Sequence, residues 1–240
     1  MIFKKILKRL IRGYRCDSKH YIDFLRKGGS KIGDNVVIFS PETFSCDIHN
    51  RHLLHIGNDV QITEYVTILT HDYSWSVIKG MTGEIIGNQN SVIVGNNVFI
   101  GMKSIILPGT NIGDNVVIGA GSVVKGIIES NSVYAGVPAK RIMSIFEFRK
   151  KRLEKQYEEA KNFAIEYFES FNKWPDQDKF HEYFFLFGNS TISGSVFDQK
   201  LKLMSNYDTS HFIYSTHIPK YKTFDDFLDS VKSDYYNSKK

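Results

Sequence analysis

Branched aliphatic residues recur at every sixth position in the middle of the chain. The unbroken series consists of Val94, Ile100, Ile106, Ile112, Ile118 and Val124. A period of six fits neither the 3.6-residue period of a helix nor the alternation of an ordinary strand. It predicts a coil in which each group of six residues, a hexad, forms one short strand and then turns a corner. Three corners close a triangular prism with the aliphatic side chains on its axis, so the pattern predicts an all-β parallel β-helix.

Two further positions of the hexad follow the same rule. The residue after the aliphatic one is often glycine, which we expect to relieve the bend. The fifth position must fit inside the corner, and small or branched residues occupy it. The glycines are Gly95, Gly101, Gly113 and Gly119, and the fifth positions hold Val98, Ser104, Thr110, Val116 and Ser122.

The same phase begins further upstream. The aliphatic series there is Ile32, Ile38, Ile56, Ile62 and Ile68, with Phe44 and Asn50 in the two slots between Ile38 and Ile56. Because Asn50 is a poor residue for an apolar axis, we expect an irregular coil around residues 45–55. The step from Ile68 to Val94 is not a multiple of six. Residues 71–91 must therefore form a loop that protrudes from the prism, and insertions in stacked repeats commonly build the binding face.

The segment ahead of the hexads, residues 1–29, is predicted to form a basic amphipathic helix. Residues 1–27 contain nine Lys or Arg against two Asp. The apolar residues Phe3, Ile6, Leu7, Leu10, Ile11 and Tyr14 fall on one helical face. Such a helix can cap the open first coil, as repeat folds generally require. It can also lie on an anionic membrane surface, and both interpretations stay open.

The segment after the hexads, residues 144–240, is predicted to be an aromatic-rich, mostly α-helical extension of the β-helix domain at 30–143. Residues 142–240 contain 22 aromatic residues, against 11 in residues 1–141. Helices are predicted over 145–173, 176–187 and 224–235, the last with Thr223 as its N-cap. The aromatic residues are expected to form a core, although an acceptor-binding surface is the alternative.

Composition excludes several classes of protein. No stretch approaches the roughly 18 consecutive apolar residues of a membrane span, and charges interrupt the N-terminus where a secretory signal has its apolar region. The two cysteines, Cys16 and Cys46, cannot form a disulfide framework, which favours a cytoplasmic protein. The net charge of +5 comes with no base-stacking aromatic module, so we expect no nucleic-acid partner.

The hexads also carry a resemblance. VIVGNNVFIGMKSIILPGTNIGDNVVIGAGSVVKG (92–126) and SVYAGVPAKRIM (132–143) resemble the hexapeptide-repeat acyltransferases. The subgroup is similar to the galactoside, maltose and capsular-polysaccharide O-acetyltransferases. The resemblance implies a left-handed parallel β-helix, a homotrimer, and acetyl-CoA bound as co-substrate in the groove between neighbouring prisms. It further implies transfer of acetyl to a sugar hydroxyl, of a surface polysaccharide or its precursor.

A sugar hydroxyl is essentially un-ionised at neutral pH, so its attack on a thioester needs a base, and imidazole suits that role. His71 closes the run Val66–Thr70 where the chain leaves the prism. The family's catalytic His occupies the corresponding place, so His71 is the candidate general base. Asp72 or a backbone carbonyl could orient its ring. Ser45 stands where the galactoside enzymes have an Asn near the acceptor.

The resemblance also implies contacts with the cofactor. Met102 and Ala120 fall where backbone meets the pantetheine arm. Lys125 and Gly126 fall near the nucleotide, and Lys140 falls on a basic residue that reaches the phosphates of CoA.

Several alternatives remain open. His49, His52 and His55 could suggest zinc, but they occupy successive faces of the prism and would not converge, so no metal is expected. The acceptor could instead be an amino sugar or a streptogramin-like antibiotic, and a non-catalytic trimeric β-helix is a further alternative. An enzyme acting on lipid-linked sugars could work at the inner face of the membrane.

Overall fold

The computed structural model describes residues 7, 10–188 and 195–239. It divides into two compact units, residues 1–148 and residues 149–240. The predicted start of the C-terminal extension, residue 144, lies close to this division. Among the helices of these described ranges, none combines the length and hydropathy needed to cross a bilayer.

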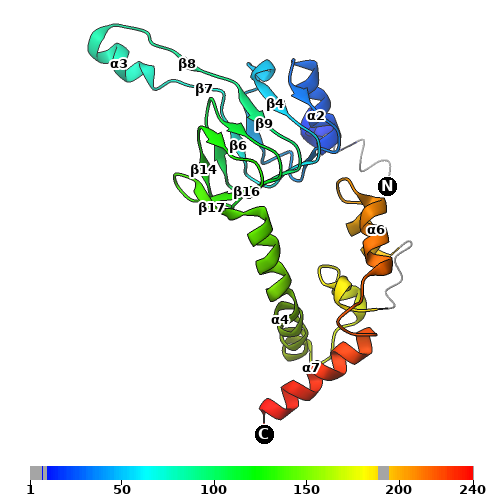
Figure 1. The fold of residues 1–240 in the computed structure, drawn as a ribbon. Helices are drawn as coiled ribbons and strands as arrows, with labels where there is room; N and C mark the ends of the chain where they lie inside the picture. The colour runs from blue at the N-terminus through cyan, green and yellow to red at the C-terminus, as the bar shows by residue number, and fades with distance from the viewer. Residues whose placement is uncertain (1–6, 8–9, 189–194, 240) are drawn as a thin grey trace. The chain divides into compact units, whose positions relative to one another are not determined.

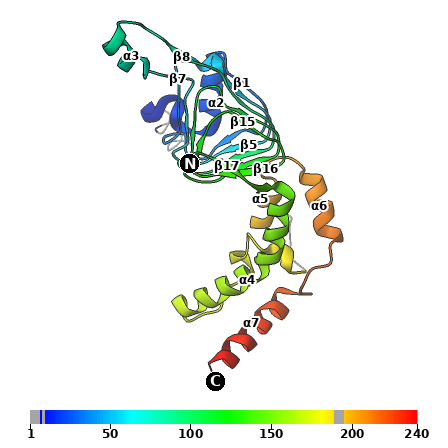
Figure 2. The ribbon, with the colours of Figure 1, turned by 60° about the vertical axis from the view of Figure 1, so that its left-hand side comes forward.

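The first unit is built on three sheets that the chain visits in turn, as Figures 1 and 2 show. The first sheet holds β1 (Lys31–Ile32), β4 (Leu54–Ile56), β9 (Val92–Val94), β12 (Asn111–Ile112) and β15 (Ile127–Ile128). The second holds β2 (Val37–Ile38), β5 (Val60–Ile62), β10 (Val98–Ile100), β13 (Val116–Ile118), β16 (Ser132–Ala135) and β17 (Lys140–Ser144). The third holds β3 (Ser45–Cys46), β6 (Thr67–Ile68), β11 (Ile105–Ile106) and β14 (Val123–Val124). All these pairs are parallel except β16 with β17.

The predicted axis is confirmed. The six aliphatic residues of the unbroken series are at most 2% exposed, and the fifth-position residues are buried as well. Ile100 lies opposite Ile62 on one neighbouring coil and Ile118 on the other. The coils therefore stack in register, and the hexad spacing predicts the core correctly.

The prediction about the hexad glycines is wrong. None of the four has a positive φ; the left-handed residue lies two positions later, at Asn97 (φ 54°), Lys103 (φ 59°), Asn115 (φ 56°) and Gly121 (φ 70°), and Asn and Gly are the residues that tolerate this region best. Glycine is needed for another reason: a Cβ on Gly101 would lie 2.6 Å from the backbone nitrogen of Ala120. The neighbouring coil leaves no room for a side chain there.

The irregular coil is confirmed, but its axis residues differ from the prediction. Phe44 is fully buried in the core of the prism, but Cys46 and not Phe44 lies opposite Ile68, because a turn at residues 40–43 adds two residues before β3. Asn50 is not an axis residue either: it precedes the 3₁₀ turn η2 (Arg51–Leu53). Burial raises the pKa of the Cys46 thiol to about 11, so this thiol stays protonated at neutral pH.

The N-terminal helix consists of two segments rather than one. After the 3₁₀ turn η1 (Gly13–Cys16), Asp17 caps α2 (Ser18–Lys27). Tyr21, Ile22 and Leu25 of α2 join the core of the prism, so α2 covers the first coil. Residues 7 and 10–12 are helical as well. Their apolar side chains Leu7, Leu10 and Ile11 are 47%, 78% and 74% exposed, whereas Phe3 and Ile6 lie outside the described residues.

Residues 71–91 leave the prism as an arm (Figure 1). Two short antiparallel strands, β7 (His71–Asp72) and β8 (Asn88–Gln89), form its base. The helix α3 (Trp75–Thr82) lies further out and has no buried residue.

The second unit is helical around an aromatic core. Its elements are α4 (Ile145–Phe171), the 3₁₀ turns η3 (Gln177–Lys179) and η4 (Phe184–Leu186), α5 (Val196–Leu201), α6 (Tyr207–Thr216) and α7 (Phe224–Ser238). The interpretation of the aromatic residues as core is confirmed by Phe180, Phe187 and Phe227, which are fully buried. Thr223 caps α7 in a capping box with Asp226.

The predicted helix at 176–187 is wrong. Phe180, Phe184 and Phe187 have helical spacing, but two separate 3₁₀ turns bring these rings into the core instead. The helices α5 and α6 were not predicted, because the sequence between 188 and 223 shows no clear period.

Candidate active site

The site forms at one corner of the prism, between the third and the first sheet. The strands β3 and β6 are neighbours in the third sheet, and each is followed by an insertion. Residues 47–53 follow β3, and the arm follows β6. Because both insertions leave at the same corner, their first residues meet.

The residues that meet are Asp47 and His71. The Nδ1 atom of His71 lies 2.6 Å from Oδ2 of Asp47. The side chain of Asp47 is 3% exposed and that of His71 is 29% exposed. Since a carboxylate only accepts hydrogen bonds, Nδ1 carries the proton in this contact, and Nε2 is left as the basic nitrogen.

The surroundings of Asp47 favour its charged form. Burial opposes ionisation, but Thr70 Oγ1 (2.7 Å) and Asn50 Nδ2 (3.0 Å) donate to the carboxylate. The backbone N–H groups of His49 and Asn50 donate to its other oxygen, at 3.0 and 3.2 Å. Together these bonds outweigh burial and hold the pKa of Asp47 well below its usual range. Asp47 is therefore an anion that fixes the imidazole.

The structure corrects the suggestion that Asp72 orients His71. Successive residues of a strand point to opposite sides, and Asp72 faces the base of the arm. Its carboxylate accepts from the backbone N–H of Ser74 at 2.9 Å, from Ser74 Oγ at 2.6 Å, and from the Asn88 amide.

Asp47 was missed because no period of the sequence places it beside His71. The two residues are 24 apart, whereas β3 and β6 pair at a distance of 22 residues, with Ser45 opposite Thr67 and Cys46 opposite Ile68. Asp47 and His71 meet because each begins an insertion just beyond these paired strands. Ser45 lies two residues before Asp47, exposed on β3.

A cavity of about 290 Å³ opens beside the pair. It is lined by His49, Asn50, His71, Asp72, Tyr73, Trp75, Gly87, Asn88 and Gln89. The lining combines polar side chains with two aromatic rings, and one of its walls is the catalytic candidate His71. A larger hollow of about 770 Å³ lies against α2, but none of the predicted catalytic or cofactor residues lines it.

The predicted cofactor residues fall at two different corners. Met102 and Ala120 lie between the second and third sheets on successive coils, where the amide of Gly121 donates to the carbonyl of Met102 at 2.7 Å. Both residues are exposed. Lys125 and Gly126 follow β14 and lie at the same corner as His71, two coils further along.

Lys140 is exposed at the start of β17, opposite Ala135. Within one chain, the structure thus brings Met102 together with Ala120. It places only Lys125 and Gly126 at the corner of His71.

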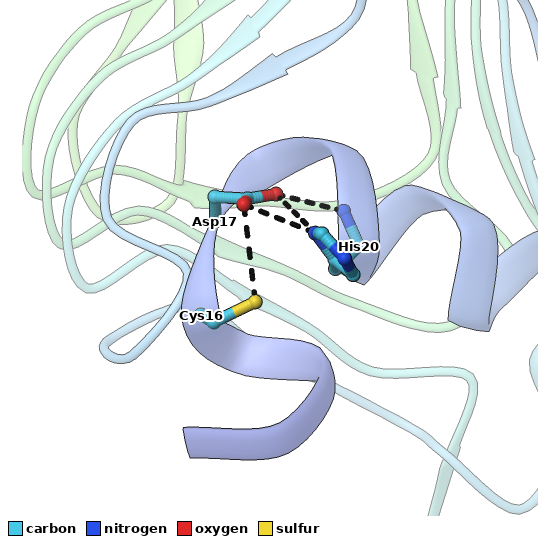
Figure 3. Close-up of side chains that lie close together, drawn as sticks. All are labelled: Cys16, Asp17 and His20. Atoms are coloured by element: carbon cyan, nitrogen blue, oxygen red, sulfur yellow. Dashed lines mark hydrogen bonds and ion pairs between the residues drawn. The ribbon is translucent and has the colours of Figure 1, made fainter. Parts of the chain in front are cut away.

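His49, His52 and His55 do not gather into a group of metal ligands. In the ranges that the structure describes, the one group of three suitable donors is Cys16, Asp17 and His20 (Figure 3). There the Asp17 carboxylate accepts from the backbone N–H of His20 at 2.9 Å and lies 2.9 Å from its ring Nδ1. These bonds form the N-cap of α2, which explains the cluster without an ion.

Hexads that close into a three-sided prism define the class of hexapeptide-repeat proteins. Residues 91–126 match the family described as "Bacterial transferase hexapeptide (six repeats)". The protein CapG from Staphylococcus aureus is 37% identical over 153 residues, which are 63% of this chain and 84% of CapG. WbbJ from Escherichia coli (strain K12), named for O-acetyl transfer in lipopolysaccharide biosynthesis, is 36% identical over 46% of this chain and 62% of its own length.

Among solved structures, a maltose O-acetyltransferase from Clostridium difficile 630 is 30% identical, with a TM-score of 0.40, over 59% of this chain and 84% of that one. The chain spans less than two thirds of WbbJ, but most of CapG. It belongs to the hexapeptide-repeat acyltransferases. The left-handed course of the coils follows from this membership.

Proposed function

We propose that this chain is an acetyl-CoA-dependent O-acetyltransferase that acts on a hydroxyl of a surface polysaccharide or its precursor. The observation that carries the proposal is the contact between His71 and the buried Asp47 beside a polar cavity. The name of WbbJ supports the same acceptor class. An amino-sugar or antibiotic acceptor is less favoured: the matches to a macrolide acetyltransferase and a chloramphenicol acetyltransferase cover only 26% and 23% of this chain, against 46% for WbbJ.

The geometry suits direct transfer. Asp47 holds the proton of His71 on Nδ1, so Nε2 takes the proton of the acceptor hydroxyl as its oxygen attacks the thioester carbonyl. The new C–O bond forms and the C–S bond breaks. The imidazolium, stabilised by Asp47, then returns its proton to the departing thiolate. General-base catalysis of this kind typically contributes about 10²–10⁴-fold to the rate.

The active unit is proposed to be a homotrimer with acetyl-CoA between neighbouring prisms. Two features support this assembly. The predicted cofactor residues lie at two corners of one prism, and a cleft between protomers would combine one corner of each. The arm also exposes Val77 (68%) and Met81 (82%), apolar surface that a neighbouring protomer would cover.

The location is proposed to be cytoplasmic, with the N-terminal segment on the inner face of the membrane. Leu7, Leu10 and Ile11 are exposed, whereas side chains of α2 cover the first coil. Residues 1–12 contain five Lys or Arg and no acidic residue. A basic segment with an exposed apolar face suits an anionic bilayer.

The test compares the wild type with His71→Ala, using acetyl-CoA and a panel of sugars, amines and streptogramins. The release of free CoA thiol measures the activity. We expect acetylation of a hydroxyl by the wild type, and a loss of kcat of about 10²–10⁴-fold in the variant. Calorimetry should show that the variant still binds acetyl-CoA. His211→Ala is the matched control, because His211 is exposed on α6. Near-normal turnover by His71→Ala would contradict the mechanism, and activity on amines alone would contradict the acceptor class.

A further inference from the structure

Two aromatic side chains at the base of the arm have no structural role in the core. Tyr73 is 68% exposed, and Trp75 is half-buried at the start of α3. Neither ring belongs to a hydrophobic core cluster formed by the described residues. Large rings left at a surface without core contacts point to a binding role.

The rings continue outward from the catalytic imidazole. The centroids of His71 and Tyr73 are 5.2 Å apart, with their planes at 85°. The centroids of Tyr73 and Trp75 are 6.1 Å apart, with their planes at 62°. All three rings line the cavity of about 290 Å³. An aromatic wall therefore begins at the imidazole of His71 and runs through Tyr73 to Trp75, at the start of α3.

The other wall of this cavity is polar. Asn88 and Gln89 on β8 supply amide groups, and both are exposed. Asp72, held by Ser74 and Asn88, ties β7 to β8 and fixes the distance between the two walls. A site with one apolar wall and a few placed amides matches a ligand that has an apolar face and a hydroxylated rim.

A pyranose ring is such a ligand, since one of its faces presents C–H groups and its edge carries hydroxyls. We infer that Tyr73 and Trp75 form a platform on which a pyranose of the acceptor stacks, with one hydroxyl directed at Nε2 of His71. This inference rests on the proposed function and names the residues that select a cyclic sugar over an acyclic alcohol. Gln89, which stands opposite His71 in the β7–β8 pair, binds another of its hydroxyls.

The first measurement does not depend on catalysis. The chain has two tryptophans, Trp75 and Trp174, and Trp174 packs on Phe168 with centroids 4.4 Å apart. In the variant Trp174→Phe, which keeps an aromatic ring there, fluorescence reports Trp75 alone. We expect a saturable change with methyl pyranosides and none with sorbitol. Equal responses to both, or no response to any pyranoside that the enzyme acetylates, would overturn the inference.

The second measurement is kinetic. Trp75→Leu and Tyr73→Leu should each raise KM for a pyranoside acceptor roughly 3- to 10-fold, the worth of one aromatic contact. The KM for acetyl-CoA should stay unchanged. Trp75→Phe should recover most of the loss, and gel filtration should show wild-type assembly for all three variants. An unchanged acceptor KM in an active enzyme refutes the platform alone, whereas activity retained in His71→Ala refutes the proposed function. A KM effect that appears only together with loss of assembly would mean that the rings form a subunit contact, and would also refute the platform.

Discussion

The variant Asp47→Asn tests the site most directly, because the carboxylate accepts from five donors. Oδ2 accepts from His71, Thr70 and the Asn50 side chain. Oδ1 accepts from the backbone N–H groups of His49 and Asn50. An asparagine replaces one of the two oxygens by an NH₂ group, which donates only.

Either orientation of the new amide is unfavourable. If its NH₂ group replaces Oδ1, it faces two backbone N–H groups that cannot rotate away. If it replaces Oδ2, it faces Nδ1 of His71, which must then accept, and the ring proton moves to Nε2. In that tautomer Nε2 is no longer a base. Two buried donors without partners cost roughly 1–3 kcal/mol each, so the variant should lose about 2 kcal/mol or more of stability.

The expected effect on rate follows from the tautomer. We expect kcat of Asp47→Asn to fall about 10²–10⁴-fold at saturating acetyl-CoA and acceptor, with KM for acetyl-CoA nearly unchanged. Thiol release at several pH values and urea unfolding measure the two effects. The control is Asp208→Asn, because Asp208 is exposed on α6 and does not line the cavity beside His71. A kcat within about three-fold of wild type for Asp47→Asn, or an equal loss in both variants, would refute the role of Asp47.

Three further predictions concern stability and binding. Because the folded-state pKa of Asp47 is lowered, its ionisation stabilises the fold above the unfolded-state pKa of about 3.9, and this contribution should shrink as pH falls below that value. Urea unfolding from pH 7 to pH 3 should therefore show the difference in free energy of unfolding between wild type and Asp47→Ala narrowing. A difference that grows on acidification contradicts the assignment. Gly101→Ala should lower the free energy of unfolding by about 1–3 kcal/mol, because its Cβ would meet the backbone at 2.6 Å. The matched change Gly80→Ala, in α3 with open space around it, should be neutral or stabilise the fold by about 0.5–1 kcal/mol. Equal unfolding midpoints for the two variants would argue against the close approach of the coils. At low salt the full chain should sediment with phosphatidylglycerol vesicles but not with phosphatidylcholine vesicles. Changing Leu7, Leu10 and Ile11 together to Ser should abolish this binding, whereas Leu203→Ser, at another exposed leucine, should not. Binding that survives the triple change would show that the N-terminal segment is not what binds the vesicle.

The sequence predicted the prism well because every coil obeys the same rule. Each aliphatic residue of the series must point inward, so a single period sets the register of three sheets. The reason for the glycines could not be read from the period, since it depends on how closely Gly101 approaches Ala120 on the next coil. The helix at 176–187 failed for a related reason: burial of Phe180 and Phe187 specifies which residues are inside, but not the path of the backbone between them.

The candidate base His71 could be predicted because it marks the point where the period breaks. Its partner could not be found by the same route, because Asp47 lies in the irregular coil where the axis residues shift from Phe44 to Cys46. Adjacency along the chain instead suggested Asp72, and the alternation of a strand excludes it. The contacts with acetyl-CoA and with other protomers stay predictions.

The two ends of the prism have a consequence for how the protein behaves in a crowded cell. A stack of identical coils has no inherent length, and each bare end offers rows of unpaired backbone groups to any similar strand. Side-chain amides reinforce the stacking, for example from Asn97 to Asn115 and from Asn115 to Asn131. At one end α2 lies across the first coil, and at the other β17 runs against the direction of its neighbours. These two elements stop growth of the stack, and we expect that a chain without them would assemble end to end into fibres.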